Sequence, residues 1–458
     1  MRLVDTHCHL DFKDFAVDMD QVIARAVSAG VERIIVPGTD LESSRKAVEL
    51  AGRYPEVFAA VGMHPHDADK ADEGVLSALR GLCITSDKVV AVGEVGLDYY
   101  RMNSTEENQK KLFRSCLDMA RELDLPLILH NREAGEDMLA LLKDAFPACM
   151  RGVMHCFSGD EGFLKEVLGM GLYVSFTGTV TFDKAQRSRD LVEKLPCEKL
   201  LLETDAPYMS PEPLRGRRNE PSNVIYLLDV YAGIYDLSAE DVARITTHNA
   251  NKLFSLGLHE KIMIAYPIRD SLYLNLTNRC TNRCSFCTRE VSNYVKGHNL
   301  KLASEPSVEE VIADMGDISN YKEIVFCGFG EPTLRLEAVK KIASFAKKSA
   351  KKVRLVTNGE GDLINKRQIA GELKGLVDVV SVSLNAPDVT TYDRICRPVF
   401  GPAAFGGILS FIEGCAREGI KVEITCLDFI GPGDVEKTKA MVEKMGASFR
   451  LRHLNVVG

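Results

Sequence analysis

The sequence lacks an apolar run close to the roughly 20 residues that a membrane-spanning helix needs. Its first residues, "MRLVDTHCHLDF", lack the apolar core of a signal peptide and have the pattern of a strand. An excess of positive charge is also absent, since the formal net charge is -8. These absences argue against a membrane protein, an exported protein and a protein that coats nucleic acid, although a local basic strip remains compatible with them.

The cysteines do not suggest a disulfide framework. There are 13 of them, an odd number, and some stand within apolar strand and helix patterns. This distribution is typical of reduced thiols in the cytosol, and we expect a cytoplasmic protein. A chain of 458 residues, with 45% hydrophobic and 27% charged residues, is expected to form a globular protein of two or three domains.

Short β-branched segments alternate with amphipathic helical patterns from the first residue onward. Eight strand–helix units occupy about 255 residues, which is the size of a closed (β/α)8 TIM barrel. The expected strands are "RLVDTHC", "VERIIVPGT", "VFAAVGMHP", "VVAVGEVG", "PLILHNRE", "GVMHCFSG", "LYVSFTG" and "LLLETDAP". We therefore predict an α/β fold that begins with such a barrel, at residues 1–257.

A segment without helical periodicity follows the barrel, and we predict a linker at residues 258–270. The strand–helix pattern then restarts with "LYLNLT", "EIVFCGFG", "VRLVTNG", "VVSVSLN", "KVEITCL" and "FRLRHLN". Six units are too few to close an eight-stranded barrel. We predict an open, partial (β/α)6 barrel for the second domain, residues 271–458.

Metal-binding residue types stand at the ends of five expected strands in the first domain. They are His7 and His9 after the first strand, Glu94 after the fourth, His130 after the fifth, His155 after the sixth and Asp205 after the eighth. In a (β/α)8 barrel these ends meet on the rim where active sites lie. Imidazoles and carboxylates together suit one or two divalent cations, Zn, Mn or Mg. Glu94 could bridge two cations, and such a pair activates water for phosphodiester hydrolysis.

The strings that carry these residues resemble the TatD family of metal-dependent deoxyribonucleases. "DTHCHL", "GEVGLDYY", "LILHNREA", "MHCFSG" and "ETDAPY" occur in that family's order over residues 1–257. The resemblance implies 3'-to-5' removal of nucleotides from DNA. It also implies one metal on His7, His9, Glu94 and Asp205, a second on Glu94, His130 and His155, and catalytic roles for Glu94 and for Asp205, which would position or deprotonate the attacking water.

Further residues near this rim are candidates for substrate binding. The loop "PLRGRRNEP" places Arg215, Arg217 and Arg218 just after Asp205, where guanidinium groups could bind phosphates. A solvated surface loop is the alternative for these arginines. His64, after the third strand, could contact substrate, whereas we expect His66 to be a loop residue.

Three cysteines lie within eight residues in "CTNRCSFC", after the first strand of the second domain. Cys280, Cys284 and Cys287 suit either zinc or an iron–sulfur cluster. A structural zinc needs four ligands, and His298 is the downstream donor within easy reach. A cubane cluster held by three cysteines would instead leave one iron free to bind a small molecule.

The spacing CxxxCxxC, with Phe286 before the last cysteine, resembles the radical S-adenosylmethionine (radical SAM) superfamily. "CGFGEPTL" after the next strand looks like that family's glycine-rich motif, with Phe329 as a departure between the glycines. The resemblance implies a [4Fe-4S] cluster on the three cysteines and reductive cleavage of S-adenosylmethionine (SAM) to methionine and a 5'-deoxyadenosyl radical. It further implies that Phe286 contributes to the cofactor site and that Gly328, Gly330, Glu331 and Pro332 receive the methionine amino group.

Other polar and cysteine residues of the second domain carry weaker expectations. Thr357, Asn358, Ser383 and Asn385 end strands, where they could face the cofactor or simply cap the chain. Arg397 could meet an anionic substrate or form a surface ion pair. We expect Cys327, Cys396, Cys415 and Cys426 to behave as small buried hydrophobic residues.

Taken together, the sequence predicts a bifunctional enzyme. Its expected partners are DNA or a nucleotide at the first barrel and an electron donor such as flavodoxin or ferredoxin at the second. Two alternatives remain: a nuclease whose cluster is structural or redox-sensing, and an amidohydrolase-like enzyme that acts on a small metabolite.

Overall fold

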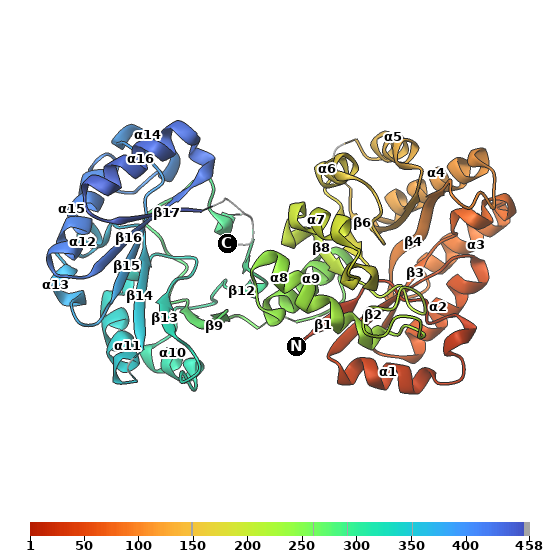
Figure 1. Ribbon diagram of the computed structural model, residues 1–458, viewed down its shortest axis with the longest axis horizontal. Coiled ribbons are helices and arrows are strands. Elements are labelled where there is room, and N and C mark those ends of the chain that lie inside the picture. The colour runs from red at the N-terminus through yellow and green to blue at the C-terminus, as the bar shows by residue number, and fades with distance from the viewer. Residues whose placement is uncertain (148–149, 260, 291, 350, 453–458) are drawn as a thin grey trace. The chain divides into compact units, whose positions relative to one another are not determined.

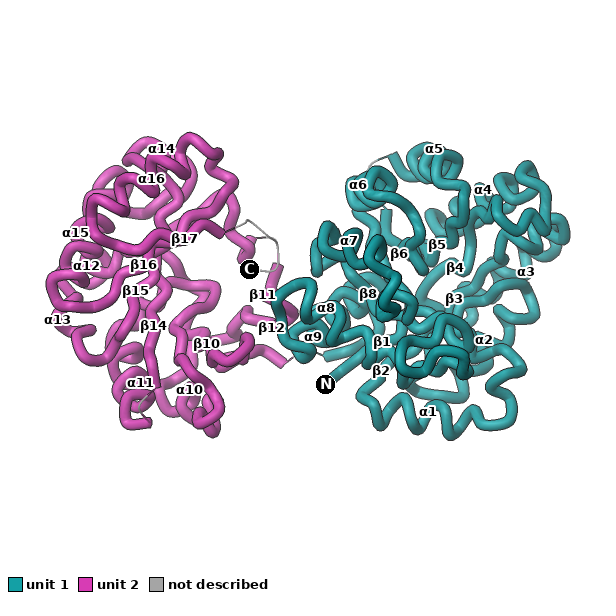
Figure 2. Tube along the Cα trace, in the orientation of Figure 1, with its two compact units in different colours: residues 1–259 teal, residues 260–458 magenta. Residues whose placement is uncertain are grey.

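The chain divides into two compact units, Met1–His259 and Glu260–Gly458, coloured separately in Figure 2. The computed structural model describes residues 1–458 except 148–149, 260, 291, 350 and 453–458. The last residues of the expected strand "FRLRHLN" lie outside the described residues. No helix in the described part of the chain is long and apolar enough to cross a membrane.

The first unit is a parallel eight-stranded barrel, as the sequence predicts (Figure 1). Its strands are β1 (Leu3–Asp5), β2 (Val31–Pro37), β3 (Val57–Val61), β4 (Val89–Asp98), β5 (Leu127–Arg132), β6 (Gly152–Met154), β7 (Tyr173–Phe176) and β8 (Leu200–Leu202). They follow one another in chain order around the sheet. The ends of β1 and β8 meet where the Thr6 amide donates to the Leu202 carbonyl at 2.9 Å, and Cys8 and Ala206 form a parallel bridge.

Helices cover the outside of this barrel. They are α1 (Met19–Ser28), α2 (Leu41–Arg53), α3 (Glu73–Cys83), α4 (Glu106–Leu123), α5 (Gly135–Ala145), α6 (Glu161–Gly169), α7 (Gln186–Lys194), α8 (Leu228–Tyr235) and α9 (Ala239–Phe254). Side-chain caps fix several starts: Asp40 accepts from the Ser43 amide, and Ser238 forms a capping box with Asp241. Strand residues alternate between a core under the helices and a core inside the barrel, so that Leu3 belongs to the first and Val4 to the second.

The second unit is an open sheet, which confirms the predicted partial barrel. Its strands are β9 (Ala265–Ile268), β10 (Ser271–Leu274), β13 (Glu323–Phe326), β14 (Lys352–Thr357), β15 (Val379–Ser383), β16 (Lys421–Leu427) and β17 (Ser448–Arg452), and β11 (Tyr294–Val295) pairs separately with β12 (His298–Asn299). The order is β17-β16-β15-β14-β13-β10-β9. The six strands from β10 to β17 run parallel, whereas β9 is antiparallel to β10.

β9 was not expected from the sequence, because it falls inside the segment predicted as a linker, residues 258–270. Pro267 interrupts its short apolar pattern, and an edge strand tolerates this proline. The helices of this unit are α10 (Val308–Met315), α11 (Leu336–Lys348), α12 (Gly361–Asn365), α13 (Ala370–Leu373), α14 (Val389–Cys396), α15 (Ala403–Arg417) and α16 (Pro432–Lys444). They pack their apolar faces on the sheet around a core that includes Phe326, Val380 and Phe411.

Gly96 in β4 determines how closely β5 approaches. It is the register partner of His130, and its φ is +149°. A Cβ atom at this position would lie 2.0 Å from the His130 carbonyl oxygen. We predict that Gly96→Ala lowers the free energy of unfolding of the first unit by about 1–3 kcal/mol, because the two backbones must separate, measured by urea denaturation. Gly52→Ala is the control, since nothing lies within 4 Å of a Cβ there; equal stability of the two variants would contradict the prediction.

Candidate functional site

The structure brings the six predicted metal donors of the first unit together at the C-terminal rim of the barrel. Glu94 and His130, expected after their strands, lie within β4 and β5, which extend further than predicted. In a first set of four donors, two carboxylates lie near the same two imidazole nitrogens. The Nε2 atoms of His7 and His9 lie 3.2 Å apart, and Glu94 Oε2 lies 3.3 and 3.7 Å from them. Asp205 Oδ1 lies 3.8 Å from His7 Nε2 and 3.5 Å from His9 Nε2. Four ligands around one Zn²⁺ ion stand about 3.4 Å apart, so the distances from the two histidines to each carboxylate suit a divalent cation, and His7, His9 and Glu94 form a group that could hold one.

A second set of donors faces the other oxygen of the same glutamate. Glu94 Oε1 lies 2.9 Å from His130 Nδ1 and 2.8 Å from His155 Nε2. These two ring nitrogens are 3.4 Å apart. Glu94 thus directs one oxygen to each donor set, which is the geometry of a carboxylate that bridges two cations.

In the absence of bound cations, protonated histidines balance the carboxylate charges of this rim. Burial opposes a charge on Glu94, but His155 and the other surrounding histidines hold its pKa well below the ordinary value. Burial lowers the pKa of His7 to about 4. For His9 and His130 burial acts in the same direction, yet nearby carboxylates outweigh it and raise both pKa values to about 9. Cations bound here would replace protons on these two rings.

Three buried carboxylates that support these donors were not identified from the sequence. Asp98 Oδ2 lies 3.1 Å from His130 Nε2, on the side of the ring opposite Glu94. Glu203 accepts from the Cys156 amide and the Ser175 hydroxyl, and its Oε2 lies 3.8 Å from His155 Nδ1. Asp5 accepts from the Thr204 amide and hydroxyl. The only sequence signal was their position within the metal-binding strings, beside the donors that they support.

His64 lies within the second donor set. Its Nε2 is 3.5 Å from Glu94 Oε1, and burial lowers its pKa to about 3, which keeps the ring neutral. His64, Glu94 and His130 form one of the groups that could hold a metal. His66, expected to be a loop residue, has its Nε2 atom 3.0 Å from Asp98 Oδ2. His64 is therefore placed either to contact substrate, as predicted, or to bind metal.

The arginine loop after β8 divides into two parts. Arg218 donates to both carboxylate oxygens of Asp18, at 2.8 and 2.7 Å, and lies over the ring of Phe15. Arg215 and Arg217 are exposed, and the guanidinium of Arg215 lies over the ring of Phe182. Arg218 is thus held by Asp18 within the protein. The exposed side chains of Arg215 and Arg217 are better placed for the predicted contact with phosphate.

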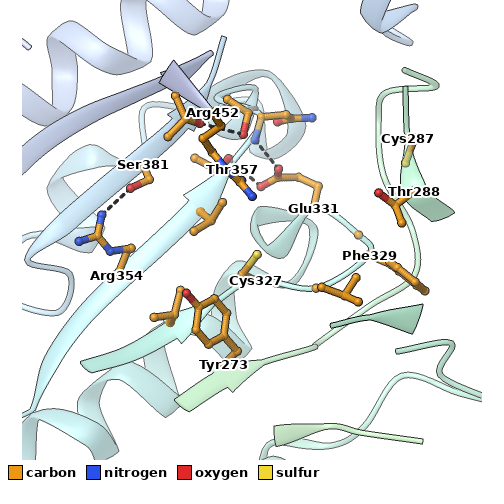
Figure 3. Close-up of a pocket in the computed structure, with 18 of the residues that line it drawn as sticks. Tyr273, Cys287, Thr288, Cys327, Phe329, Glu331, Arg354, Thr357, Ser381 and Arg452 are labelled. Carbon is orange, nitrogen blue, oxygen red and sulfur yellow. Dashed lines mark hydrogen bonds between the residues drawn. The ribbon is translucent and has the colours of Figure 1, made fainter. Parts of the chain in front are cut away.

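In the second unit, the three cysteines of "CTNRCSFC" line a cavity of about 580 Å³ at the C-terminal ends of the strands. Figure 3 shows Cys287 and Thr288 on one side of this cavity and Thr357 and Arg452 on the other. The same cavity reaches Gly328, Gly330 and Glu331. Burial raises the pKa of the Cys280 thiol to about 12. The binding of iron would therefore displace protons from these thiols.

The cysteine loop is fixed by contacts with α14 and with the end of β14. The Arg283 amide donates to the Cys396 carbonyl at 3.0 Å. The Asn282 side-chain amide donates to the Tyr392 hydroxyl at 2.8 Å, and that of Asn358 donates to the Thr281 hydroxyl at 2.8 Å. The loop is thus held in place by the polypeptide itself.

The glycines of "CGFGEP" allow two loops to pack closely. A Cβ at Gly328 would lie 2.2 Å from Asn275 Oδ1, and one at Gly330 would lie 2.3 Å from the Arg279 carbonyl. Phe329, the departure from the family motif, packs with the apolar cluster of Tyr266, Ile268 and Leu300. Its side chain therefore fills a local core and does not prevent the turn.

Glu331 anchors the glycine-rich loop to the next strand. Its carboxylate accepts from the Thr333 amide and hydroxyl, from the Thr357 hydroxyl at 2.8 Å and from the Asn358 amide at 2.7 Å. Pro332 is buried at the start of the following turn, and Phe286 lies against Phe429 with ring centroids 4.7 Å apart. The predicted cofactor contacts of these residues stay predictions.

The zinc alternative finds no support in the geometry. His298 Nε2 lies 2.9 Å from the Pro267 carbonyl, and His298 is not among the residues that line the cysteine cavity. Four ligands around zinc would bring thiolates to about 3.8 Å from one another. Among the described residues, the groups of three or more donors within 4.8 Å of one another contain no cysteine.

Cys396 is buried as expected, but it also lies beside Cys284 of the cysteine loop, which the sequence did not predict. A hydrogen bond with the Cys396 thiol, followed by burial, raises the pKa of Cys284. Cys396 also lines the cavity. The Cys396 thiol is therefore a further sulfur in the region, directly beside Cys284.

The remaining weaker candidates have mixed surroundings. Thr357, Asn358, Ser383 and Asn385 all line the cavity, as do Cys327 and Cys426. Asn385 also accepts from the Leu427 amide, which is a capping contact. Cys415 belongs to the apolar core. Arg397 ends α14 in a left-handed conformation, with φ of 46°.

Comparison with known proteins gives both units a family. Residues 4–255 match the family described as TatD related DNase, and residues 274–445 match the radical SAM superfamily. Both resemblances drawn from the sequence motifs are confirmed.

Individual relatives match the first unit along almost their whole length. A protein of Bacillus subtilis, the uncharacterized metal-dependent hydrolase YabD, is 41% identical over 255 residues, which are 56% of this chain and 100% of that protein. The 3'-5' ssDNA/RNA exonuclease TatD of Salmonella typhimurium is 36% identical over 262 residues, with 56% and 99% covered. The crystal structure of YjjV, a TatD homologue from Escherichia coli, superposes with a TM-score of 0.53 at 35% identity and covers 56% of this chain and 98% of its own.

Asp98 provides a test of how His130 is oriented. We predict that Asp98→Asn weakens Mn²⁺ binding by about 10–100-fold, because an amide can present a donor to His130 Nε2 and favour the wrong tautomer. Isothermal titration with Mn²⁺ measures the effect. Asp118→Asn, which removes an exposed pair with Arg121 on α4, is the matched control. Unchanged Mn²⁺ affinity in Asp98→Asn would show that His130 does not depend on this carboxylate.

The position of Cys396 generates a second test. Ligands of different irons in one cubane stand farther apart than two hydrogen-bonded thiols, so we expect Cys396 not to bind iron. Cys284→Ala should lose iron and acid-labile sulfide after anaerobic reconstitution, whereas Cys396→Ala and the core variant Cys415→Ala should keep them. A loss of iron in Cys396→Ala equal to that in Cys284→Ala would contradict this assignment.

Proposed function

The chain belongs to the TatD related DNase family through residues 4–255, and we propose that this unit removes nucleotides from the 3' end of DNA with two divalent cations. The observation that carries the proposal is the division of Glu94 between two donor sets. The Salmonella relative is named a 3'-5' ssDNA/RNA exonuclease, which supports the same reaction class.

The proposed roles follow the positions of the side chains. His7, His9 and Asp205 would hold one cation, His130 and His155 the other, and Glu94 both. The cations would supply an activated water and stabilise charge on the phosphate oxygens. Asp205 is also suited to orient that water, since it is the rim carboxylate at the end of β8 and has a left-handed backbone with φ of 54°.

We also propose that the second unit binds a [4Fe-4S] cluster through Cys280, Cys284 and Cys287, and SAM beside it. Its radical SAM assignment and the cavity shared by the three cysteines with the glycine-rich loop support this. When bound, these groups supply reductive cleavage of SAM. The protein's part is to hold the cysteine loop by Tyr392 and Asn358, to keep the glycine-rich loop against β14 by Glu331, and to enclose the reaction. An electron donor of the flavodoxin or ferredoxin class would be required.

The nuclease proposal predicts a large effect of two substitutions. His130→Ala and Asp205→Asn should each reduce Mn²⁺-dependent release of nucleotides from 3'-labelled single-stranded DNA by more than about 100-fold, beyond the range for supporting residues. His259→Ala, an exposed histidine outside the rim, should retain full activity. Nuclease activity in either rim variant close to wild type would refute the two-metal assignment, and hydrolysis of small amides but not DNA would favour the amidohydrolase alternative.

The radical proposal predicts a product that can be measured without knowing the substrate. The reconstituted chain with SAM and dithionite should release 5'-deoxyadenosine and methionine, detected by liquid chromatography and mass spectrometry. Cys287→Ala should release neither, yet should keep its nuclease activity. A wild-type chain with full iron and sulfide content that releases no 5'-deoxyadenosine would leave only a structural or sensing role for the cluster.

A further inference from the structure

The inner face of the open sheet in the second unit is polar, although its outer face packs on helices. Alternate residues of β16 show this: Val422 and Ile424 are buried toward the helices, whereas Glu423 and Thr425 line the cavity. The residues of the sheet that line the cavity with polar side chains include Tyr273, Glu323, Arg354, Ser381, Ser383, Glu423, Thr425, Arg450 and Arg452. A closed core would not place these groups inside a barrel, so this face is built for a polar ligand.

Arg354 in β14 is already neutralised by its neighbours. Its Nε lies 3.1 Å from Glu323 Oε2 on β13, and its Nη1 lies 3.0 Å from Glu423 Oε1 on β16. The same nitrogen donates to the Ser381 hydroxyl at 2.7 Å, as Figure 3 shows. One guanidinium thus spans three strands and satisfies two carboxylates of the cavity.

The other two carboxylates that line the cavity also have partners. Asp270 pairs with Lys322 at 2.7 Å. Glu331 accepts from Thr333, Thr357 and Asn358. Each of the four lining carboxylates is therefore already bonded within the protein, three of them to a cationic side chain and Glu331 to neutral donors.

Arg450 and Arg452 on β17 add further positive charge to the lining of the cavity. They are the register partners of Thr425 and Leu427, and they alternate with Phe449, which packs toward the core. Alternate residues of one strand lie about 7 Å apart and share a face, so both guanidiniums can reach one ligand. In the part of the chain that the structure describes, neither has an ion-pair partner within 4.0 Å.

The guanidinium of Arg452 reaches into the cavity from the edge strand. Figure 3 shows it directed toward Thr357 and Glu331. The charge of Arg452 also acts on Cys327: burial raises the pKa of that thiol to about 11, and Arg452 opposes the rise. Arg452 therefore stands over the space between the glycine-rich loop and the inner face of the sheet.

We propose that the substrate of the radical reaction carries an oxyanion, a phosphate or a carboxylate, and that Arg450 and Arg452 bind it inside the cavity. The inference rests on the proposed radical SAM function and adds the chemical class of the substrate. Paired guanidiniums present fixed N–H donors that match the oxygens of such a group. Arg354, held by Glu323 and Glu423, orients the inner face but is not available to the ligand.

Isothermal titration with three anionic probes tests the proposal. The full chain is reconstituted with its cluster and saturated with SAM without a reductant, in a His130→Ala background and without added divalent cations, so that binding at the first unit is suppressed. The probes are inorganic phosphate, deoxyadenosine monophosphate and succinate. At least one should bind, and Arg450→Gln/Arg452→Gln should raise its dissociation constant by at least about tenfold. Lysine at both positions should restore part of the affinity, whereas Arg417→Gln, an exposed arginine on α15, should change nothing.

The results distinguish a phosphate-bearing substrate from a carboxylate, and they show whether the proposal fails. Binding of phosphate or deoxyadenosine monophosphate identifies a phosphate-bearing substrate, and binding of succinate alone identifies a carboxylate. The absence of binding by all three probes, or equal binding by the glutamine variant, would overturn the proposal. So would a loss of SAM affinity in that variant with unchanged iron content, because the arginines would then serve the carboxylate of SAM. Failure of the radical SAM function itself is read separately, from the release of 5'-deoxyadenosine by the wild type.

Discussion

The contact between the ends of β1 and β8 is the constraint on which the first site depends. The Asp205 amide donates to the His7 carbonyl at 2.9 Å, and Asp5 accepts from the backbone and hydroxyl of Thr204. These bonds join residues about 200 positions apart, and they bring the first and last metal-binding strings of the chain to the same point. Burial raises the pKa of Asp5 to about 8, so a protonated Asp5 remains a hydrogen-bonding partner there without adding another charge. The barrel therefore closes beside the candidate metal donors, because the same short segments carry both the closing hydrogen bonds and those donors.

The second unit has no such closure, and it fixes its site by a buried polar network. Tyr392 accepts from Asn282 in the cysteine loop, and its hydroxyl lies 3.3 Å from Glu360 Oε1. Burial raises the pKa of Glu360 to about 7, so this carboxyl can share a proton with the network. An open sheet leaves room for a ligand between its edges, and the position of the cysteine loop must therefore be set by side chains behind it.

The fold could be predicted almost completely from the sequence. Strand–helix units leave a regular apolar pattern, and the number of these units distinguishes the closed barrel of the first domain from the open sheet of the second. β9 was missed because Pro267 breaks a short segment that only the pairing with β10 reveals as a strand. The candidate donors of the first site could be proposed from the sequence because histidines at strand ends are unusual, and the structure brings their side chains together. Asp98 and Glu203 could not be proposed, because a carboxylate near a strand end is common and its partner depends on the register of neighbouring strands.

The roles of Arg450 and Arg452 could not be predicted from the sequence for the same reason. In the sequence "SFRLRHLN" they alternate with apolar residues, which predicts a strand with one polar face but not what that face meets. Their meaning depends on Glu323 and Glu423, more than 25 residues away, being already paired with Arg354. The overall net charge of -8 conceals this arrangement. The first site gathers carboxylates and imidazoles, which suit cations, whereas the second presents two guanidiniums, which suit an anion, and each proposed ligand class follows from the local charge of its site.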